Sequence, residues 1–302
     1  MILELDRLRG ELRENEPMSR HTSWRAGGPA RRYYRPADLD DLALFLSLLD
    51  EAEPVYWTGL GSNLLVRDGG WRGTVIATHG TLGRLEHRGG GRVYAGAGVA
   101  CAKLARRCGR WGLGGADFFA GIPGTVGGAL AMNTGAFGGE TWDCVAAVEV
   151  IDRRGALHRR PAGAYRTGYR QVQGPEPDSL EREWFVAAEL RFGPGADGDA
   201  GARIRDLLAR RSASQPTGVA SCGSVFRNPP GDHAARLIEA CGLKGRRIGN
   251  AGVSEKHANF IVNLGKARAA EIEALILEVQ AEVARRFGVR LEPEVRIVGE
   301  AE

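Results

Sequence analysis

The stretch FFAGIPGTVGGALAMNTGAFGG, residues 118–139, limits what this chain can fold into, because it holds seven glycines and no charged side chain. A membrane span needs about 20 mostly apolar residues, so length alone permits one. The composition argues against it, since glycine and Pro123 weaken a helix and leave few side chains for packing. The stretch instead predicts a backbone kept bare so that a ligand can approach it.

Length and composition indicate a globular protein of two or three compact units, with 302 residues of which 43% are hydrophobic. The net charge of +4 is modest and the basic residues are scattered, so nucleic acid is not indicated as a partner. The five cysteines are odd in number and never spaced C-x-x-C, which argues against a disulfide framework and a metal site. The first residues lack the pattern of a signal peptide, so we expect a cytoplasmic protein without a membrane segment. The oligomeric state is not indicated.

Hydrophobic periodicity predicts a mixture of helices and strands joined by glycine-rich turns. Helices are expected at 2–15, 37–52, 99–111, 202–212, 233–241 and 267–287. Strands are expected at 54–59, 64–66, 71–78, 184–192 and 295–298, with a hairpin over 145–162. The segment GPGADGDAG, residues 193–201, is poor in apolar residues and is the predicted linker at the main domain boundary.

Two glycine-rich segments, GLGSNLLV at 59–66 and GIPGTVGG at 121–128, require a common explanation. Neither matches the Rossmann fingerprint or the P-loop. Their N–H groups could converge on phosphate oxygens, so that the two loops jointly hold a pyrophosphate without a cationic side chain. The alternative is that each is a tight turn between strands. The occurrence of both segments in one domain favours the pyrophosphate-binding explanation over two unrelated turns.

Several motifs resemble, in the same order, the UDP-N-acetylenolpyruvoylglucosamine reductase family. They extend from about His21 to Gly299 and are HTSWRAGGPA, TGLGSNLLV, FFAGIPGTVGGALAMNTGAFG, YRTG, CGSVFRNPPGDHAARLIEACGLKGRRIGNAGVSEKHANFIVN and LEPEVRIVG. GIPG is shared with other flavoproteins of the same superfamily, whereas the combination with GSVFRNP and HANFIVN is specific.

The resemblance implies an α+β fold, with a two-part FAD-binding region of the vanillyl-alcohol-oxidase/PCMH type and a C-terminal α+β substrate-binding domain. The implied parts are residues 1–80, to which a C-terminal strand within 291–302 returns, then 81–198, then the substrate-binding domain at 199–290. Only 224 − 165 = 59 positions separate Tyr165 from Ser224, which resembles the shorter subclass of the family.

The implied activity is a hydride relay from NADPH through noncovalent FAD to the enolpyruvyl group of a UDP-sugar. It yields UDP-N-acetylmuramate for peptidoglycan synthesis in the cytoplasm, and so serves cell wall biogenesis, cell shape and cell division. The preference for NADPH rests on family likeness alone, because the sequence has no recognisable motif for the ribose phosphate.

Three residues match the family's catalytic positions: Ser224 in GSVFRNP as the proton donor, Arg166 in YRTG as the stabiliser of the developing enolate, and Glu294 in PEVR as the polarising acid. Without the resemblance, Ser224 would be interpreted as a turn residue, and Arg166 and Glu294 as ordinary surface residues. Arg170 repeats the Tyr-Arg dipeptide, and Glu292 lies two residues before Glu294; both are the rival assignments.

The implied cofactor and substrate residues lie within the same motifs. Tyr165 and Asn228 are expected to contact the substrate, and His257 is expected to be structural rather than catalytic. The predicted cofactor residues are Gly59, Gly61, Ser62, Asn63, Leu64, Gly121, Ile122, Pro123, Gly124, Thr125, Gly127, Gly128, Asn133, Gly135 and Ala136.

Two other functions are compatible with the glycine loops. Another FAD-dependent oxidoreductase of this fold would share the loops but lack the Ser224, Arg166 and Glu294 set. A non-catalytic nucleotide-binding protein would bind flavin without its being reduced by NADPH.

Overall fold

The computed structural model describes residues 6–195 and 200–302. Its contacts divide the chain into two compact units, each built from three separate segments of sequence. The first unit holds the segment ending at Arg13 with Tyr33–Gly59 and Thr74–Ala209. The second holds Glu14–Arg32, Leu60–Gly73 and Arg210–Glu302.

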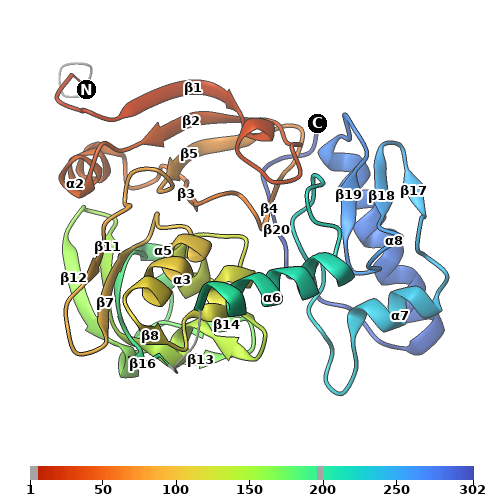
Figure 1. The fold of residues 1–302 in the computed structure, drawn as a ribbon. Helices are drawn as coiled ribbons and strands as arrows, with labels where there is room; N and C mark the ends of the chain where they lie inside the picture. Colours follow the sequence, from red (N-terminus) through yellow and green to blue (C-terminus); the bar gives the residue numbers. More distant parts are fainter. Residues whose placement is uncertain (1–5, 196–199) are drawn as a thin grey trace. The chain divides into compact units, whose positions relative to one another are not determined.

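The main sheet of the first unit has five antiparallel strands in the order β12-β11-β15-β7-β6, of which β12, β11 and β7 are labelled in Figure 1. The strands are β6 (Leu85–His87), β7 (Arg92–Gly96), β11 (Val145–Asp152), β12 (Leu157–Pro161) and β15 (Glu183–Arg191). The central strand β15 is buried from Phe185 to Ala188, on both faces, because helix α4 (Val126–Met132) packs on it and Val186 lies in a second hydrophobic core. This sheet forms one core with α3 (Cys101–Arg110) and η2 (Asp117–Gly121).

Shorter elements complete the first unit. They are β8 (Leu113–Gly114), β9 (Gly135–Ala136), β10 (Gly139–Glu140), η3 (Thr141–Cys144), η4 (Ala162–Ala164), β13 (Arg166–Gly168), β14 (Gln171–Gln173), α5 (Ser179–Arg182), β16 (Gly193–Pro194) and α6 (Ala200–Ser214), which crosses into the second unit.

A four-stranded sheet has the order β1-β2-β5-β3, with β3 and β5 parallel. Its strands are β1 (Glu11–Pro17), β2 (Pro29–Arg35), β3 (Val55–Thr58) and β5 (Trp71–Ala77). Helix α2 (Leu39–Leu48) begins at Asp38, whose side chain accepts a hydrogen bond from the Asp41 N–H at 3.0 Å. Leu42, Phe45 and Leu46 of α2 are buried in a second core of the first unit.

Asp41 is a buried carboxylate that fixes the chain before α2. It accepts hydrogen bonds from Tyr34 Oη and from the N–H groups of Arg9 and Ala37, the last two at 2.8 Å. Burial opposes its ionisation, but these hydrogen bonds outweigh burial and lower the pKa of Asp41. The stabilisation is therefore present above the unfolded pKa and is lost as the pH falls through the folded pKa.

We expect Asp41→Asn to lower the free energy of unfolding at neutral pH by about 1–3 kcal/mol, because buried donors lose a charged acceptor. Below about pH 4 the difference from the wild-type chain should shrink, since Asp41 itself becomes protonated there. Urea unfolding of both proteins across this pH range measures the effect. A difference that is the same at neutral and acidic pH would contradict the assignment to the charge.

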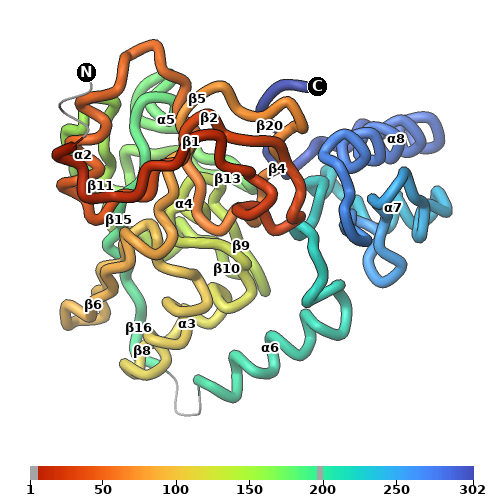
Figure 2. The backbone as a smooth tube through the Cα atoms, turned by 90° about the horizontal axis from the view of Figure 1, so that it is seen from above, coloured from red at the N-terminus to blue at the C-terminus, as the bar shows by residue number. Residues whose placement is uncertain are grey.

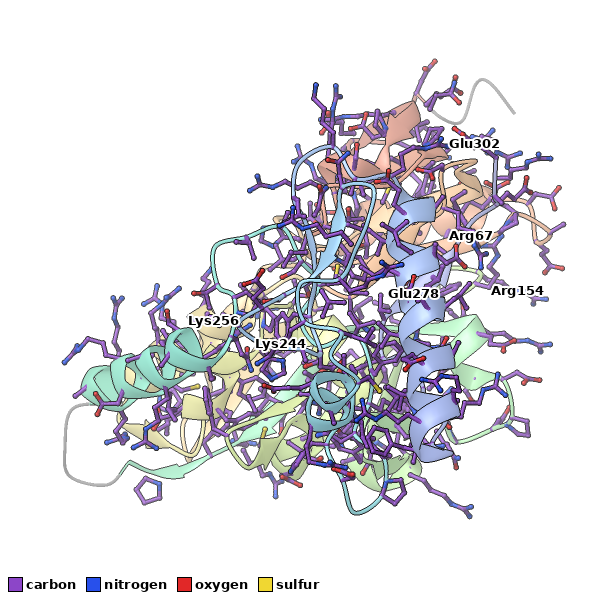
Figure 3. The ribbon with its side chains drawn as sticks, turned by 90° about the vertical axis from the view of Figure 1, so that its right-hand side faces the viewer. Arg67, Arg154, Lys244, Lys256, Glu278 and Glu302 are labelled. Atoms are coloured by element: carbon purple, nitrogen blue, oxygen red, sulfur yellow. The ribbon has the colours of Figure 1, made fainter. Side chains whose placement is uncertain are left out.

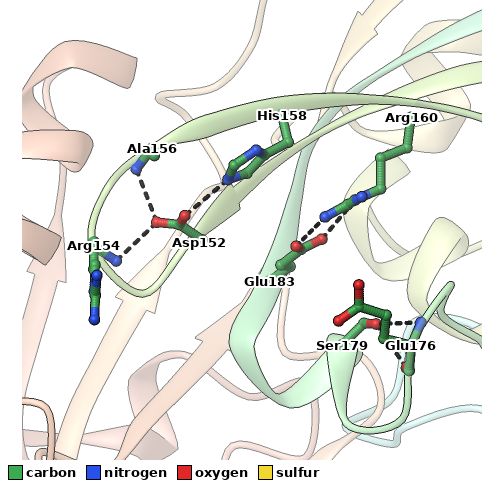
Figure 4. A network of polar contacts seen from close by, with 8 residues as sticks. All are labelled: Asp152, Arg154, Ala156, His158, Arg160, Glu176, Ser179 and Glu183. Carbon is green, nitrogen blue, oxygen red and sulfur yellow. Dashed lines mark hydrogen bonds and ion pairs between the residues drawn. The ribbon is translucent and has the colours of Figure 1, made fainter.

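The hairpin of β11 and β12 has a polar turn (Figure 4). Asp152 accepts hydrogen bonds from the N–H groups of Arg154 and Ala156, both at 2.9 Å, and lies 2.8 Å from Nε2 of His158. Arg160 on β12 pairs with Glu183 at the start of β15. The turn contacts therefore set the register in which both strands join the sheet.

In the second unit α8 (Ala269–Phe287) packs against the sheet β17-β18-β19, and α7 (Ala234–Ala240) packs against α8. The strands are β17 (Arg247–Ile248), β18 (Ala251–Val253) and β19 (Ile261–Asn263), and a separate parallel pair joins β4 (Leu64–Val66) to β20 (Arg296–Val298). A 3-10 turn, η1 (Met18–Arg20), lies near the start of this unit's sequence.

Residues just after β4 anchor α8. The carboxylate of Asp68 accepts hydrogen bonds from the N–H groups of Ala269 and Ala270, and so caps the start of α8. Arg67, labelled in Figure 3, pairs with Glu273 on α8 and donates to the carbonyl of Gly299. The β4–β20 pair is thus attached to the longest helix of the unit.

Most of the predicted elements are confirmed, including the long helix with its buried face and the hairpin over 145–162. The predicted helix over 2–15 is wrong over residues 6–15, which form a turn and then β1, because pairing with β2 outweighs a weak helical pattern; residues 2–5 lie outside the described residues. The predicted linker at 193–201 contains residues 196–199, which lie outside the described residues. The predicted three-part division of the chain stays a prediction.

Candidate functional site

The uncharged stretch at 118–139 folds as several short elements rather than as one helix. It runs through η2, a loop, α4, β9 and β10, and can be followed from α4 to β10 in Figure 2. Across the described ranges 6–195 and 200–302, no helix is both long and apolar enough to cross a membrane. Gly121, Gly127 and Gly135 of this stretch serve close packing, since a Cβ there would meet a neighbour at 2.4, 2.8 and 2.5 Å.

The two glycine-rich loops meet at Gly59 and Thr125. A Cβ atom at Gly59 would lie 2.3 Å from Oγ1 of Thr125, so only glycine fits there without displacing that side chain. Thr125 is buried, and it is the residue before α4. Segments that are more than sixty positions apart in sequence thus share one contact. Such a contact is needed if the two loops are to hold one pyrophosphate together.

Part of the 121–128 loop is committed to its own framework. The N–H groups of Ile122, Val126 and Gly127 already donate to carbonyls of Phe119, Val99 and Ala97, at 3.1, 2.8 and 2.9 Å. Within the described structure the N–H groups of Gly124, Thr125 and Gly128 remain candidate donors of the loop. These donors suit the oxygens of an anionic cofactor group.

Gly128 marks an open surface at the start of α4. A Cβ atom there would approach only Oγ1 of Thr125, at 3.9 Å, and the residue is exposed. By contrast, a Cβ at Gly121 would lie 2.4 Å from the ring of Phe137, so Gly121 is required by packing within the protein. Donors at Gly124 and Thr125 next to the bare surface at Gly128 fit the phosphates of a dinucleotide.

The other loop turns back at Gly61, in the second unit. Gly61 has a φ of +60°, and a Cβ there would lie 1.9 Å from the carbonyl oxygen of His21. Its own carbonyl accepts a hydrogen bond from the N–H of Ser23 at 3.0 Å. The HTSW segment therefore supports the GLGSN loop directly, and this contact explains why both motifs occur together.

Ser224 lies on a segment held from two sides within the second unit. The buried Asn259 accepts from the N–H of Phe226 at 2.9 Å and donates to its carbonyl at 2.8 Å, and its own carbonyl accepts from Val225. Gly223, with a φ of +73°, sets the turn into this segment. Ser224 itself is half-buried, so its hydroxyl is positioned by a rigid backbone yet not enclosed.

Glu294 joins the same segment. Its N–H donates to the carbonyl of Val225 at 2.7 Å, and its carbonyl accepts from Nδ2 of Asn63 at 3.0 Å. The structure thus brings the predicted Ser224, Glu294 and Asn63 into one backbone network. Glu292, the rival acid, is exposed, and its side chain lies 3.8 Å from that of Arg227.

Arg166 and its neighbours belong to the first unit. Tyr165 is 7% exposed, packs against Trp142 and Phe185, and burial raises its pKa to about 12. Arg166, the next residue, is exposed at the start of β13. Arg170 donates to the carbonyl of Gly135 at 3.1 Å, so the rival arginine is engaged with the protein backbone.

Two further predicted residues make contacts that the sequence did not indicate. Oδ1 of Asn228, an exposed residue, accepts a hydrogen bond from the N–H of Ala234 at 3.1 Å and so supports the start of α7. His257 is half-buried with its ring on Phe260, and within the described residues its Nδ1 has no hydrogen-bond partner. Burial, followed by the charge of Lys244, lowers the pKa of His257.

Asn259 is the structural residue that sequence reasoning missed. The motif that contains it, HANF, indicates the family but no role for this side chain. The two hydrogen bonds between the Asn259 amide and the backbone of Phe226 join residues thirty-three positions apart. A hydrophilic side chain between Ala258 and Phe260 in a buried run was the available signal.

Two family models match the chain. One, described as an FAD binding domain, matches residues 30–160. The other, described as the C-terminal domain of UDP-N-acetylenolpyruvoylglucosamine reductase, matches residues 215–298. The α+β class, with an FAD-binding region followed by a C-terminal domain, is thereby confirmed.

Similar proteins extend over nearly the whole chain. The UDP-N-acetylenolpyruvoylglucosamine reductase of Alkalilimnicola ehrlichii is 63% identical over 97% of this chain and 96% of that protein. The reductase of Methylococcus capsulatus is 62% identical over 97% of this chain and 95% of its own length. A crystal structure of the reductase from Thermus caldophilus matches with a TM-score of 0.80 and 33% identity, over 96% of this chain and 99% of that one.

Proposed function

This chain belongs to the UDP-N-acetylenolpyruvoylglucosamine reductase family, and we propose that it is the flavoenzyme that reduces UDP-N-acetylglucosamine enolpyruvate to UDP-N-acetylmuramate in peptidoglycan precursor synthesis. The observation that carries the proposal is the 63% identity to a reductase across 97% of the chain. NADPH is the proposed hydride donor. The five cysteines are free thiols, which supports the proposed cytoplasmic location.

We propose that the two glycine-rich loops hold FAD, with the candidate N–H donors of Gly124 and Thr125 directed at its phosphates. When bound, FAD carries hydride from the nicotinamide donor to the substrate. Gly59 keeps the two loops close together, as the 2.3 Å distance from its Cβ position to Oγ1 of Thr125 supports.

The reaction needs a proton donor and a stabiliser for negative charge, and both roles are proposed for this chain's own residues. Hydride addition to the enol ether builds carbanion character beside the substrate carboxylate. We propose that the Ser224 hydroxyl protonates that carbon and that the planar guanidinium of Arg166 binds the carboxylate and stabilises the enolate. Glu294 is proposed to orient the reacting group, which its backbone bond beside Ser224 supports. Substrate contacts by Tyr165 and Asn228 remain proposals.

The decisive experiment mixes photoreduced protein with UDP-N-acetylglucosamine enolpyruvate without oxygen. Rapid reoxidation of the flavin by this substrate is expected. A flavin that is reduced by NADPH but not reoxidised would indicate another oxidoreductase, and a flavin that NADPH fails to reduce would indicate a binding protein.

Replacing Gly128 tests the cradle. We expect Gly128→Leu to fold with at least wild-type stability, since helical glycine costs about 1 kcal/mol relative to a good helix former. It should nevertheless be purified with far less FAD, because the new side chain occupies the bare surface at α4. The ratio of flavin absorbance to protein measures this. Gly193→Leu, at a glycine of the first unit with nothing within 4 Å of its Cβ, is the control and should keep its FAD.

Replacing Arg166 tests the stabiliser. Arg166→Lys keeps the charge but loses the planar fork, so substrate reduction should slow strongly while FAD content stays normal. Steady-state kinetics with varied substrate measures the effect. If Arg170→Lys is damaging while Arg166→Lys is harmless, the two arginines have been assigned the wrong way round.

A further inference from the structure

Asn133 is predicted from the sequence to contact the cofactor, but its side-chain amide forms hydrogen bonds within the protein. Nδ2 donates to Oε2 of Glu140 at 2.8 Å and to the carbonyl of Gly168 at 3.1 Å. Oδ1 accepts from the N–H of Trp142 at 3.1 Å. An amide nitrogen has two hydrogens, and both are used here. With 2% of the residue exposed, Asn133 has no donor left for a ligand.

The bond to Gly168 attaches the strand that carries Arg166. Strand β13 contains only Arg166, Thr167 and Gly168, and it pairs solely with the equally short β14 among the described strands. A hairpin of three residue pairs is marginal by itself. Its position therefore depends on what it is attached to.

Two hydrogen bonds to the segment that follows α4 contribute to that attachment, beside the packing of Val172 against the core of the first unit. Asn133 is the residue at which α4 ends, and it holds the carbonyl of Gly168. Arg170, in the turn of the hairpin, donates to the carbonyl of Gly135. The chain that leaves the glycine loop through α4 thus carries the hairpin of Arg166.

We infer that Asn133 is a positioning residue for Arg166: through Gly168 it fixes the hairpin from which the guanidinium reaches the substrate. This inference rests on the proposed function. It replaces the predicted role of Asn133 as a cofactor contact with a role in substrate reduction. Misplacement of a reacting group by about 1 Å can slow a reaction roughly 10²-fold, so a loosened hairpin should have a large effect.

The variant Asn133→Gly removes the amide without straining the backbone, because residue 133 has a φ of +44°, which glycine adopts readily. Glu140→Gln is the matched control, since the glutamine oxygen can still accept from Nδ2 of Asn133. The FAD content, the thermal midpoint, and kcat and KM for the UDP-sugar are measured for each variant, alone and combined with Arg166→Lys.

We expect Asn133→Gly to keep its FAD and to lose roughly 10²-fold in substrate reduction. In the Arg166→Lys background the same change should add little, because the two residues act as one unit. Loss of FAD from Asn133→Gly, or losses that multiply in the double variant, would overturn the inference. If Arg166→Lys alone is harmless, the proposed role of Arg166 fails instead, and the two failures are distinguishable.

Discussion

Ser224→Ala is expected to affect only one of the two half-reactions. Reduction of the substrate by the flavin should slow by at least the 10²–10⁴-fold typical of a lost general acid, while reduction of the flavin by NADPH should keep about its wild-type rate. The half-reaction with NADPH requires no proton at the enolpyruvyl carbon. The substitution also leaves the support of the segment intact, because Val225 and Phe226 are held through backbone groups. Stopped-flow absorbance at the flavin band measures both half-reactions separately.

Ser224→Cys is the companion variant. A thiol is a stronger acid than a hydroxyl and sits in nearly the same place, so part of the lost rate should return. Equal slowing of both half-reactions in Ser224→Ala would make this residue structural. An unimpaired reaction with the substrate would place the proton donor elsewhere.

Gly61→Ala is expected to have the largest effect on stability. The new Cβ would lie 1.9 Å from the carbonyl oxygen of His21, and the φ of +60° adds about 1–2 kcal/mol for any residue with a Cβ. Because backbone rather than a flexible side chain must move, we expect a lowered thermal midpoint and protein purified without FAD.

Gly218→Ala separates the two causes. Gly218 has a φ of +79°, but nothing lies within 4 Å of its Cβ. Gly218→Ala should therefore show the loss of stability caused by the positive φ alone, without a steric clash between the new Cβ and a neighbouring atom. If both variants are destabilised equally, the contact between Gly61 and His21 is not the cause.

Much of the fold was predictable because many elements carry their own signal. The buried face of α8 follows from apolar residues at helical spacing, from Ile272 to Val283. The β11–β12 hairpin follows from alternating strands around a turn that contains Gly155. The strand at Glu11–Pro17 did not follow, since its pairing with β2 depends on residues well removed in sequence.

The candidate site shows a similar limit. Sequence motifs selected Ser224 and Glu294, and the structure joins their segments through Val225. The motifs could not reveal how polar side chains divide their hydrogen bonds. Asn133 and Asn228 stand in cofactor and substrate motifs, yet their amides bind backbone groups of the protein. Such partners are set by tertiary contacts, which a single sequence does not display.

The pairing of β4 with β20 has a consequence for how the chain is made. Leu64 to Val66 leave the ribosome 296 − 64 = 232 positions before their partners, Arg296 to Val298. Until then the strand that follows the GLGSN loop has an unpaired edge, and contacts this distant in sequence form slowly. A nascent chain therefore cannot support the strand after the GLGSN loop with this pairing until Arg296 to Val298 have been made. A premature stop shortly before Arg296 would leave β4 without this partner and the loop before it unsupported.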